Sequence, residues 1–103
     1  MPVNPLEKKE MLQELCRQYG ISYLGLFGSY ARGEATPESD VDFLVKFKKE
    51  SRPKGLFGYA DVGNKFADLL GKEIDLVETR LVREEFKPFI YSSLKTIYAT
   101  PNN

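Results

Sequence analysis

Two neighbouring stretches decide the fold and the chemistry predicted for this chain: LFGSYARG at residues 26–33 and SDVDFLV at residues 39–45. The first is an apolar strand that runs into a Gly-Ser turn and a short basic helix. The second is another apolar strand, and it opens with Asp40 and Asp42. Because side chains alternate along a strand, both carboxylates are expected on one side of it, with Cα atoms about 7 Å apart.

This pair of carboxylates predicts a metal site. At an effective dielectric constant of about 20, two charges at that separation repel each other by roughly 2 kcal/mol, and the apolar residues around them exclude water. A bound divalent cation removes the repulsion. Oxygen ligands on nearby positions suit Mg²⁺ or Mn²⁺, which keep part of their coordination shell for water and substrate phosphates.

Gly28 and Ser29 form the second half of the predicted site. A glycine that leaves a strand and a serine that opens a helix let backbone N–H groups and a hydroxyl face one point, where an anion binds well. Ten residues separate this turn from Asp40, so a short helix and a turn can bring the two features together. A nucleoside triphosphate with its metal ions fits this combination better than a lone phosphate.

The joined pattern resembles the signature of minimal nucleotidyltransferases in the DNA polymerase beta superfamily. It comprises Gly28-Ser29, Ala31-Arg32-Gly33 and Ser39-Asp40-x-Asp42, with one apolar strand leading into the first half and another continuing from the second. The resemblance extends over nearly the whole chain. It implies an α+β fold over residues 1–103 as one domain, with a small mixed sheet and helices packed mainly on one face.

The resemblance also implies roles for individual residues. Asp40, Asp42 and Asp75 would bind two Mg²⁺ ions as the catalytic carboxylates, and Gly28 and Ser29 would hold the β- and γ-phosphates of ATP. For Asp75, a charge within the apolar strand expected at 73–77, the alternative is a salt bridge to a lysine such as Lys72. For Arg32, contact with the phosphates and a salt bridge to Asp40, Asp42 or Glu34 stay open.

Composition removes several other classes of protein. The 103 residues contain no histidine, which excludes Ser-His-Asp hydrolases and histidine-ligated zinc enzymes. Lys and Arg together number 15, as do Asp and Glu, so the chain lacks the excess positive charge of a protein that grips nucleic-acid backbone. The single cysteine, Cys16, and the absence of an apolar leader or span predict a reducing, cytoplasmic setting away from membranes.

Periodicity predicts the remaining elements. A helix that starts after Asn4 and ends at Gly20 has an apolar face that includes Cys16, which we expect to be a buried, inert thiol. Strands are expected at 21–27 and 41–47. The basic segment 46–54 is expected to be an exposed loop, either merely solvated or a docking surface. A second amphipathic helix follows from Tyr59 to Leu70.

The C-terminal part is less determined. Residues 83–93 predict a helix in which Pro88 begins a new turn or causes a kink. Residues 96–99 fit either an edge strand or a frayed helix end. Several apolar and aromatic side chains crowd this region, and some are expected to face another subunit. They are Phe86, Phe89, Ile90, Tyr91, Ile97 and Tyr98.

The short chain offers no domain for an acceptor, so we expect another chain to present it. Resemblance to minimal nucleotidyltransferases that act with HEPN-domain toxins implies transfer of AMP from ATP to a tyrosine hydroxyl of such a toxin. This chain would then be the antitoxin. Two alternatives stay open: a non-catalytic module that covers the toxin or holds a nucleotide, and a catalytic subunit that modifies a small molecule or nucleic acid.

Overall fold

The computed structural model describes residues 4–53 and 55–101. Its centre is a four-stranded sheet with strand order β3-β2-β1-β4. The strands are β1 (Ile21–Phe27), β2 (Val41–Phe47), β3 (Ile74–Glu78) and β4 (Lys95–Ala99). β1 pairs antiparallel with β2 and with β4, whereas β2 and β3 are parallel. The sheet is therefore mixed, as the resemblance implied.

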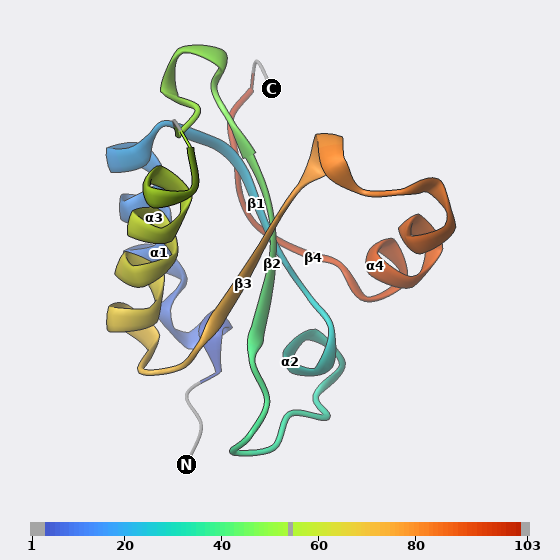
Figure 1. The fold of residues 1–103 in the computed structure, drawn as a ribbon. Helices are drawn as coiled ribbons and strands as arrows, with labels where there is room; N and C mark the ends of the chain where they lie inside the picture. Colours follow the sequence, from blue (N-terminus) through green and yellow to red (C-terminus); the bar gives the residue numbers. More distant parts are fainter. Residues whose placement is uncertain (1–3, 54, 102–103) are drawn as a thin grey trace.

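The two long helices cover one face of this sheet. They are α1 (Lys9–Tyr19), which the 3₁₀ turn η1 (Pro5–Lys8) precedes, and α3 (Gly55–Leu70) (Figure 1). Asn4 caps η1 by accepting a hydrogen bond from the backbone N–H of Leu6 at 2.9 Å, and Gly20 ends α1 in a left-handed conformation. α3 is the long connection that two parallel neighbouring strands require. The expected arrangement, with helices mainly on one face, is confirmed.

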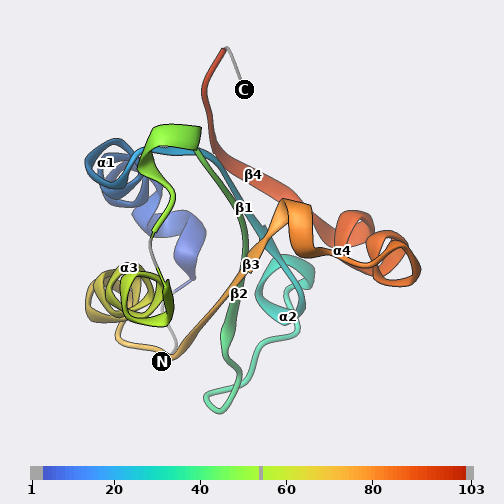
Figure 2. The same ribbon diagram turned by 45° about the horizontal axis from the view of Figure 1, so that its top comes forward.

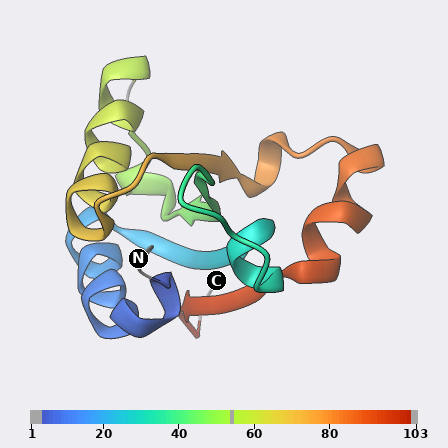
Figure 3. The same cartoon turned by 90° about the horizontal axis from the view of Figure 1, so that it is seen from below.

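Shorter elements lie on the other face. They are α2 (Ser29–Arg32) and α4 (Lys87–Ser93), and α4 projects from the sheet as part of an arm (Figures 1 and 2). Figure 3 shows α2 and this arm on the side of the sheet away from α1 and α3. The arm also contains two 3₁₀ turns, η3 (Thr79–Leu81) and η4 (Glu84–Phe86).

Alternation along the strands separates two apolar clusters. Val41, Phe43 and Val45 of β2 are fully buried in the main core with Leu12 and Phe66 of the long helices. The intervening Leu44 belongs to a second cluster with Phe27 and Ile90, on the face where α4 packs. Because Asp42 alternates with Phe43 as Leu44 does, it shares the face of α4.

The ambiguous C-terminal residues form an edge strand, β4, which pairs with β1. Pro88 does not kink a helix, because η4 ends at Phe86 and Pro88 lies in the first turn of α4, which begins at Lys87. The basic segment is exposed at Lys46, Lys48, Lys49 and Arg52. Lys49 belongs to the 3₁₀ turn η2 (Lys49–Ser51), and Lys54 lies outside the described residues.

No helix within the described chain is long and apolar enough to cross a lipid bilayer.

Candidate active site

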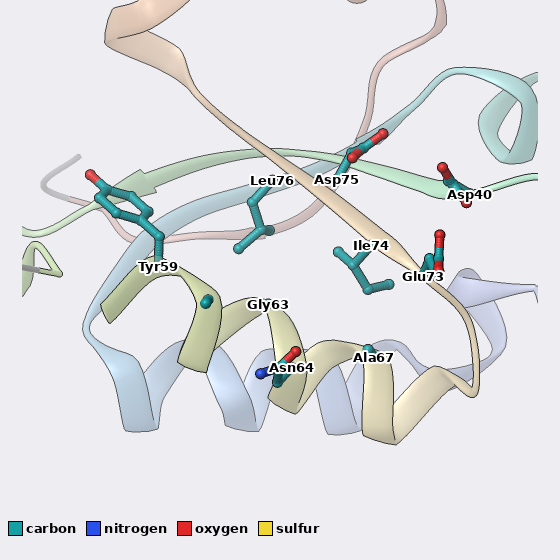
Figure 4. A pocket seen from close by; sticks show the side chains of 10 residues that line it. Asp40, Tyr59, Gly63, Asn64, Ala67, Glu73, Ile74, Asp75 and Leu76 are labelled. Carbon is teal, nitrogen blue, oxygen red and sulfur yellow. The ribbon is translucent and has the colours of Figure 1, made fainter. Parts of the chain in front are cut away.

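Asp42 and Asp75 lie side by side on adjacent strands. They are direct partners in the parallel register of β2 and β3, and Asp75 sits on the opposite side of β3 from Ile74 and Leu76, which face α3 (Figure 4). Lys72 is not the partner of Asp75, because its ammonium donates to the carbonyl of Pro37 instead. Within the described part of the chain, Asp75 forms no ion pair with a basic side chain.

The electrostatics of Asp42 reflect this crowding. The pKa of the Asp42 carboxyl is raised to about 6, and burial is the largest cause. The charge of Asp75, a side-chain hydrogen bond with Asp75 and, to a smaller extent, the charge of Asp40 contribute to the same rise. Two carboxyl groups that resist simultaneous ionisation form a donor set that a divalent cation fits, since the cation favours the charged form of both.

Asp40 is exposed and lies just before β2, which begins at Val41, whose N–H bonds the carbonyl of Glu73 at 2.9 Å. Its negative charge contributes to the raised pKa of Asp42, so Asp40 acts on the pair. Asp40 and Asp75 line one end of a cavity of about 430 Å³ between α3 and β3 (Figure 4). No group of three acidic, histidine or cysteine side chains in residues 4–53 and 55–101 is arranged to hold a metal ion as the structure stands.

Gly28 leaves space for the Asp42 carboxylate. Phe27, the last residue of β1, is paired with Asp42 in register, so the backbone of Gly28 passes directly over that side chain. A Cβ atom at Gly28 would lie 2.3 Å from Oδ2 of Asp42, and Gly28 has φ +76° and ψ −154°, which only glycine adopts readily. Asp42 therefore requires glycine at position 28 for steric reasons, whether or not a phosphate binds there.

Ser93 is the residue of the site that the sequence did not predict. Its hydroxyl accepts a hydrogen bond from the Gly28 N–H at 3.1 Å and donates to the carbonyl of Ile90 at 3.4 Å. The Gly28 amide therefore has the Ser93 hydroxyl as its acceptor in this structure. No local pattern marks Ser93, because 65 residues separate it from Gly28.

Ser29 is the open half of the turn. It is the first residue of α2 and is partly exposed, and its hydroxyl forms no hydrogen bond with the described residues. The first N–H groups of any helix also lack acceptors within that helix. Ser29 and the first turn of α2 therefore offer the donors for an anion.

Arg32 pairs with Glu34, one of the salt bridges that the sequence left open. Its Nε lies 2.8 Å from Oε1 of Glu34, and its guanidinium carbon lies 5.7 Å from the centre of the Phe89 ring. Its positive charge still acts on Asp42, whose pKa it lowers against the larger effect of burial. Arg32 is thus within electrostatic reach of the carboxylates.

Comparison with known proteins identifies the family of the chain. The family model described as nucleotidyltransferase domain matches residues 8–97. A protein adenylyltransferase, MntA, of Thermococcus cleftensis is 43% identical over 65 residues, which cover 63% of each chain. A candidate protein adenylyltransferase of Methanocaldococcus jannaschii is 32% identical over 93 residues, covering 86% of this chain and 89% of that relative.

Solved structures share the fold. A candidate minimal nucleotidyltransferase has a TM-score of 0.75 at 29% identity and covers 92% of this chain and 95% of its own. A chain in a crystal structure of a toxin–antitoxin with AMP-PNP has a TM-score of 0.74 at 22% identity, covering 91% and 75%. Another, from a complex of a tri-AMPylated Shewanella oneidensis HEPN toxin with an MNT antitoxin, has a TM-score of 0.67 at 19% identity, covering 93% and 73%.

These matches and the site place the chain in the nucleotidyltransferase domain family, as an enzyme of that family. Within it, the chain is a minimal nucleotidyltransferase of the group whose relatives are named protein adenylyltransferases.

Proposed function

We propose that this protein transfers AMP from ATP to a tyrosine hydroxyl of a HEPN-domain toxin, in a reaction that depends on Mg²⁺, and that it acts as the antitoxin. The observation that carries the proposal is the direct contact of Asp42 with Asp75 beside the open Ser29 end of α2. Support comes from relatives named protein adenylyltransferases and from the fold shared with antitoxin chains. A reducing, cytoplasmic setting is consistent with the unpaired, buried Cys16.

The roles follow from the chemistry of each group. Asp42 and Asp75 would hold the metal, with Asp40 just before β2 acting on the pair. When bound, Mg²⁺ neutralises charge on the triphosphate and lowers the pKa of the acceptor hydroxyl. The hydroxyl of Ser29 and the first N–H groups of α2 would bind the terminal phosphates. Arg32 would break its salt bridge with Glu34, or keep it while also contacting the nucleotide, and its positive charge would stabilise the phosphates.

In the transfer, the acceptor oxygen forms a bond to the α-phosphorus while the bond from that phosphorus to the bridging oxygen of the β-phosphate breaks. Pyrophosphate leaves with the electron pair of the broken bond, and the acceptor proton goes to solvent. Positioning and electrostatic stabilisation dominate such phosphoryl chemistry. The lack of histidine in the chain is therefore no obstacle.

The test uses a purified HEPN-domain protein from the same genome, ATP labelled at the α-phosphate, and Mg²⁺. We expect label on the HEPN protein with the wild-type chain and a loss of at least a hundredfold in Asp42→Asn and in Asp75→Asn. Asp61→Asn is the matched control, because Asp61 is an exposed aspartate of α3 outside the site. Label that survives Asp42→Asn, or label on RNA or an aminoglycoside with no protein labelled, would reject the proposal.

A further inference from the structure

Exposed apolar side chains are concentrated on one segment of the molecule. Among the described residues, five large hydrophobic side chains are strongly exposed, and four of them lie between residues 81 and 91. They are Leu81 (64%), Phe86 (53%), Phe89 (60%) and Tyr91 (46%), which we call the arm patch. All four belong to η3, η4 and α4, which project from the sheet away from the long helices (Figures 1 and 2). Clustered exposure of this kind marks interaction surfaces.

The arm patch is joined to the candidate active site by two contacts. Phe89 lies under the guanidinium of Arg32, which acts on the pKa of Asp42. At the other end of α4, the Ser93 hydroxyl accepts the Gly28 N–H. The arm and the carboxylates also share one face of the sheet, since Leu44, which packs with Ile90 of α4, alternates on β2 as Asp42 does.

A cavity extends the patch inward. It has a volume of about 340 Å³ and lies between the arm and the sheet, with walls that are mostly apolar. Its lining residues are Tyr23, Leu44, Lys46, Thr79, Tyr91 and Leu94. Because Tyr91 belongs both to this cavity and to the patch, a protein seated on the patch can place an apolar anchor side chain in the cavity, the arrangement typical of interface hot spots.

We propose that the arm patch is the docking surface for the protein that carries the acceptor hydroxyl, with an apolar surface of that protein covering Leu81, Phe86, Phe89 and Tyr91. This inference rests on the proposed function, which requires an acceptor from another chain. The position of the patch supports that occupant, because α1 and α3 cover the opposite face and an acceptor must approach Asp42 and Asp75 from the side of α2 and α4 (Figure 3). A second copy of this chain has no corresponding need to lie beside these carboxylates.

The experiment measures docking separately from transfer. All proteins carry Asp42→Asn, and their binding to the purified HEPN-domain protein is measured by calorimetry. Adding Phe86→Glu or Tyr91→Glu places a charge in the patch, and we expect binding to weaken at least tenfold for each. Phe89 is left intact because it contacts Arg32. Met11→Glu is the matched control, since Met11 is 56% exposed on α1 and away from the arm, and we expect it to bind as the parent does.

Two further measurements complete the test. In the wild-type background, we expect Phe86→Glu and Tyr91→Glu to keep their Mg²⁺–ATP-induced rise in melting temperature while transfer to the HEPN protein falls. Unchanged binding of both patch variants would overturn the inference without touching the proposed function. A dimer of the wild-type chain in sedimentation that Phe86→Glu disperses would also overturn it, since the occupant would then be a second copy. Patch-dependent docking without any transfer would reject the proposed function and, with it, the role of the patch in presenting an acceptor.

Discussion

Gly28, just after β1, has no side chain, and the carboxylate of Asp42 on β2 uses the space that this leaves. Oδ2 of Asp42 lies only 2.3 Å from the position that a Cβ atom of residue 28 would take. This contact explains why the glycine ends β1 and why Asp42 is held half-buried beside Asp75. At the scale of single residues, both steric space at Gly28 and the charge of Asp75 therefore determine the environment of Asp42.

Gly28→Ala should strain the backbone at residue 28 and displace the carboxylate of Asp42. We expect a loss of about 2 to 3 kcal/mol in the free energy of unfolding, because the conformation of residue 28 is nearly restricted to glycine. Nucleotidyl transfer should fall by at least a hundredfold as Asp42 moves. Urea unfolding and a transfer assay measure the two effects.

Gly33→Ala is the control for this change. Gly33 also has a positive φ, +74°, but an added Cβ would meet nothing within 4 Å. We expect about 1 kcal/mol of destabilisation from the left-handed backbone, with transfer retained. Equal activity of the two alanine variants would contradict the contact between residue 28 and Asp42 as the cause.

The raised pKa of Asp42 predicts how stability depends on pH in protein treated with a chelator. Because the folded pKa of about 6 exceeds the ordinary aspartate value of 3.8, this carboxyl favours the folded state below about pH 4. That contribution is lost as the pH rises through 6. Asp42→Asn should therefore leave stability nearly unchanged at pH 4 and raise it at pH 7.5 by about 1 kcal/mol, once solvent screening is allowed for.

Urea unfolding at both pH values tests this expectation. Added Mg²⁺ should stabilise the wild-type protein at pH 7.5, because a ligand of the folded state shifts the equilibrium towards it. The same addition should have little effect on Asp42→Asn. A variant that is destabilised at pH 7.5 would show that repulsion with Asp75 does not govern this site.

At the scale of elements, α4 and α3 each hold one part of the site. α4 reaches back to the end of β1 through Ser93 and Gly28. α3 is tied to the end of β3 by the Tyr59 hydroxyl, which donates to Oε2 of Glu78 at 2.6 Å. Glu78 is 6% exposed and also pairs with Arg80 at 3.0 Å, so this carboxylate is buried but partnered.

Ser93→Ala removes the acceptor of the Gly28 N–H and leaves that amide partly buried without a partner. We expect a loss of about 1 kcal/mol in the free energy of unfolding and a several-fold rise in KM for ATP as the turn loosens. Ser92→Ala is the matched control, since the Ser92 hydroxyl bonds only the carbonyl of Phe89 within the same helix and is exposed. If both variants behave alike, the contact between α4 and β1 does not matter to the turn.

Tyr59→Phe tests the connection between α3 and β3. Removing the hydroxyl deprives the buried Glu78 carboxylate of one donor, which we expect to cost about 1 to 2 kcal/mol in thermal or urea unfolding. Tyr91→Phe serves as the reference, because Tyr91 is exposed and donates no hydrogen bond to a described residue. A neutral effect of Tyr59→Phe would mean that Arg80 and Arg52 satisfy Glu78 without the hydroxyl.

At the scale of the whole molecule, Cys16 reports on the integrity of the main core. Its side chain is fully buried between α1 and the sheet, and burial raises the pKa of its thiol to about 12. Only the thiolate reacts readily with alkylating reagents. In the folded protein, Cys16 thus resists alkylation for two reasons: reagents cannot reach the sulfur, and the thiol stays protonated.

We therefore expect modification of Cys16 to require global unfolding. Its alkylation rate in increasing urea should follow the unfolded fraction seen by circular dichroism. Rapid labelling well below the unfolding midpoint would show that α1 detaches locally from the sheet. The fully unfolded chain in high urea supplies the reference rate for the free thiol.

Much of the fold was predictable because its signals are local. The bounds of β1, α2 and β2 follow from apolar runs and the glycines between them, and the expected helix at 59–70 and strand at 73–77 lie within α3 and β3 or differ by one residue. β4 could not be decided because a five-residue edge strand depends on its partner β1. Of the candidate site, the resemblance rather than periodicity supplied Asp75.

By itself, the sequence determined the alternation of strands and helices, the Gly-Ser turn and the pair of acids, because each depends on neighbours within a few residues. Only the tertiary structure decided that Asp75 lies against Asp42 and that the Ser93 hydroxyl accepts the Gly28 N–H. These contacts join residues brought together by the parallel crossover and by the arm. Their geometry is set by packing across the sheet, which no local pattern encodes.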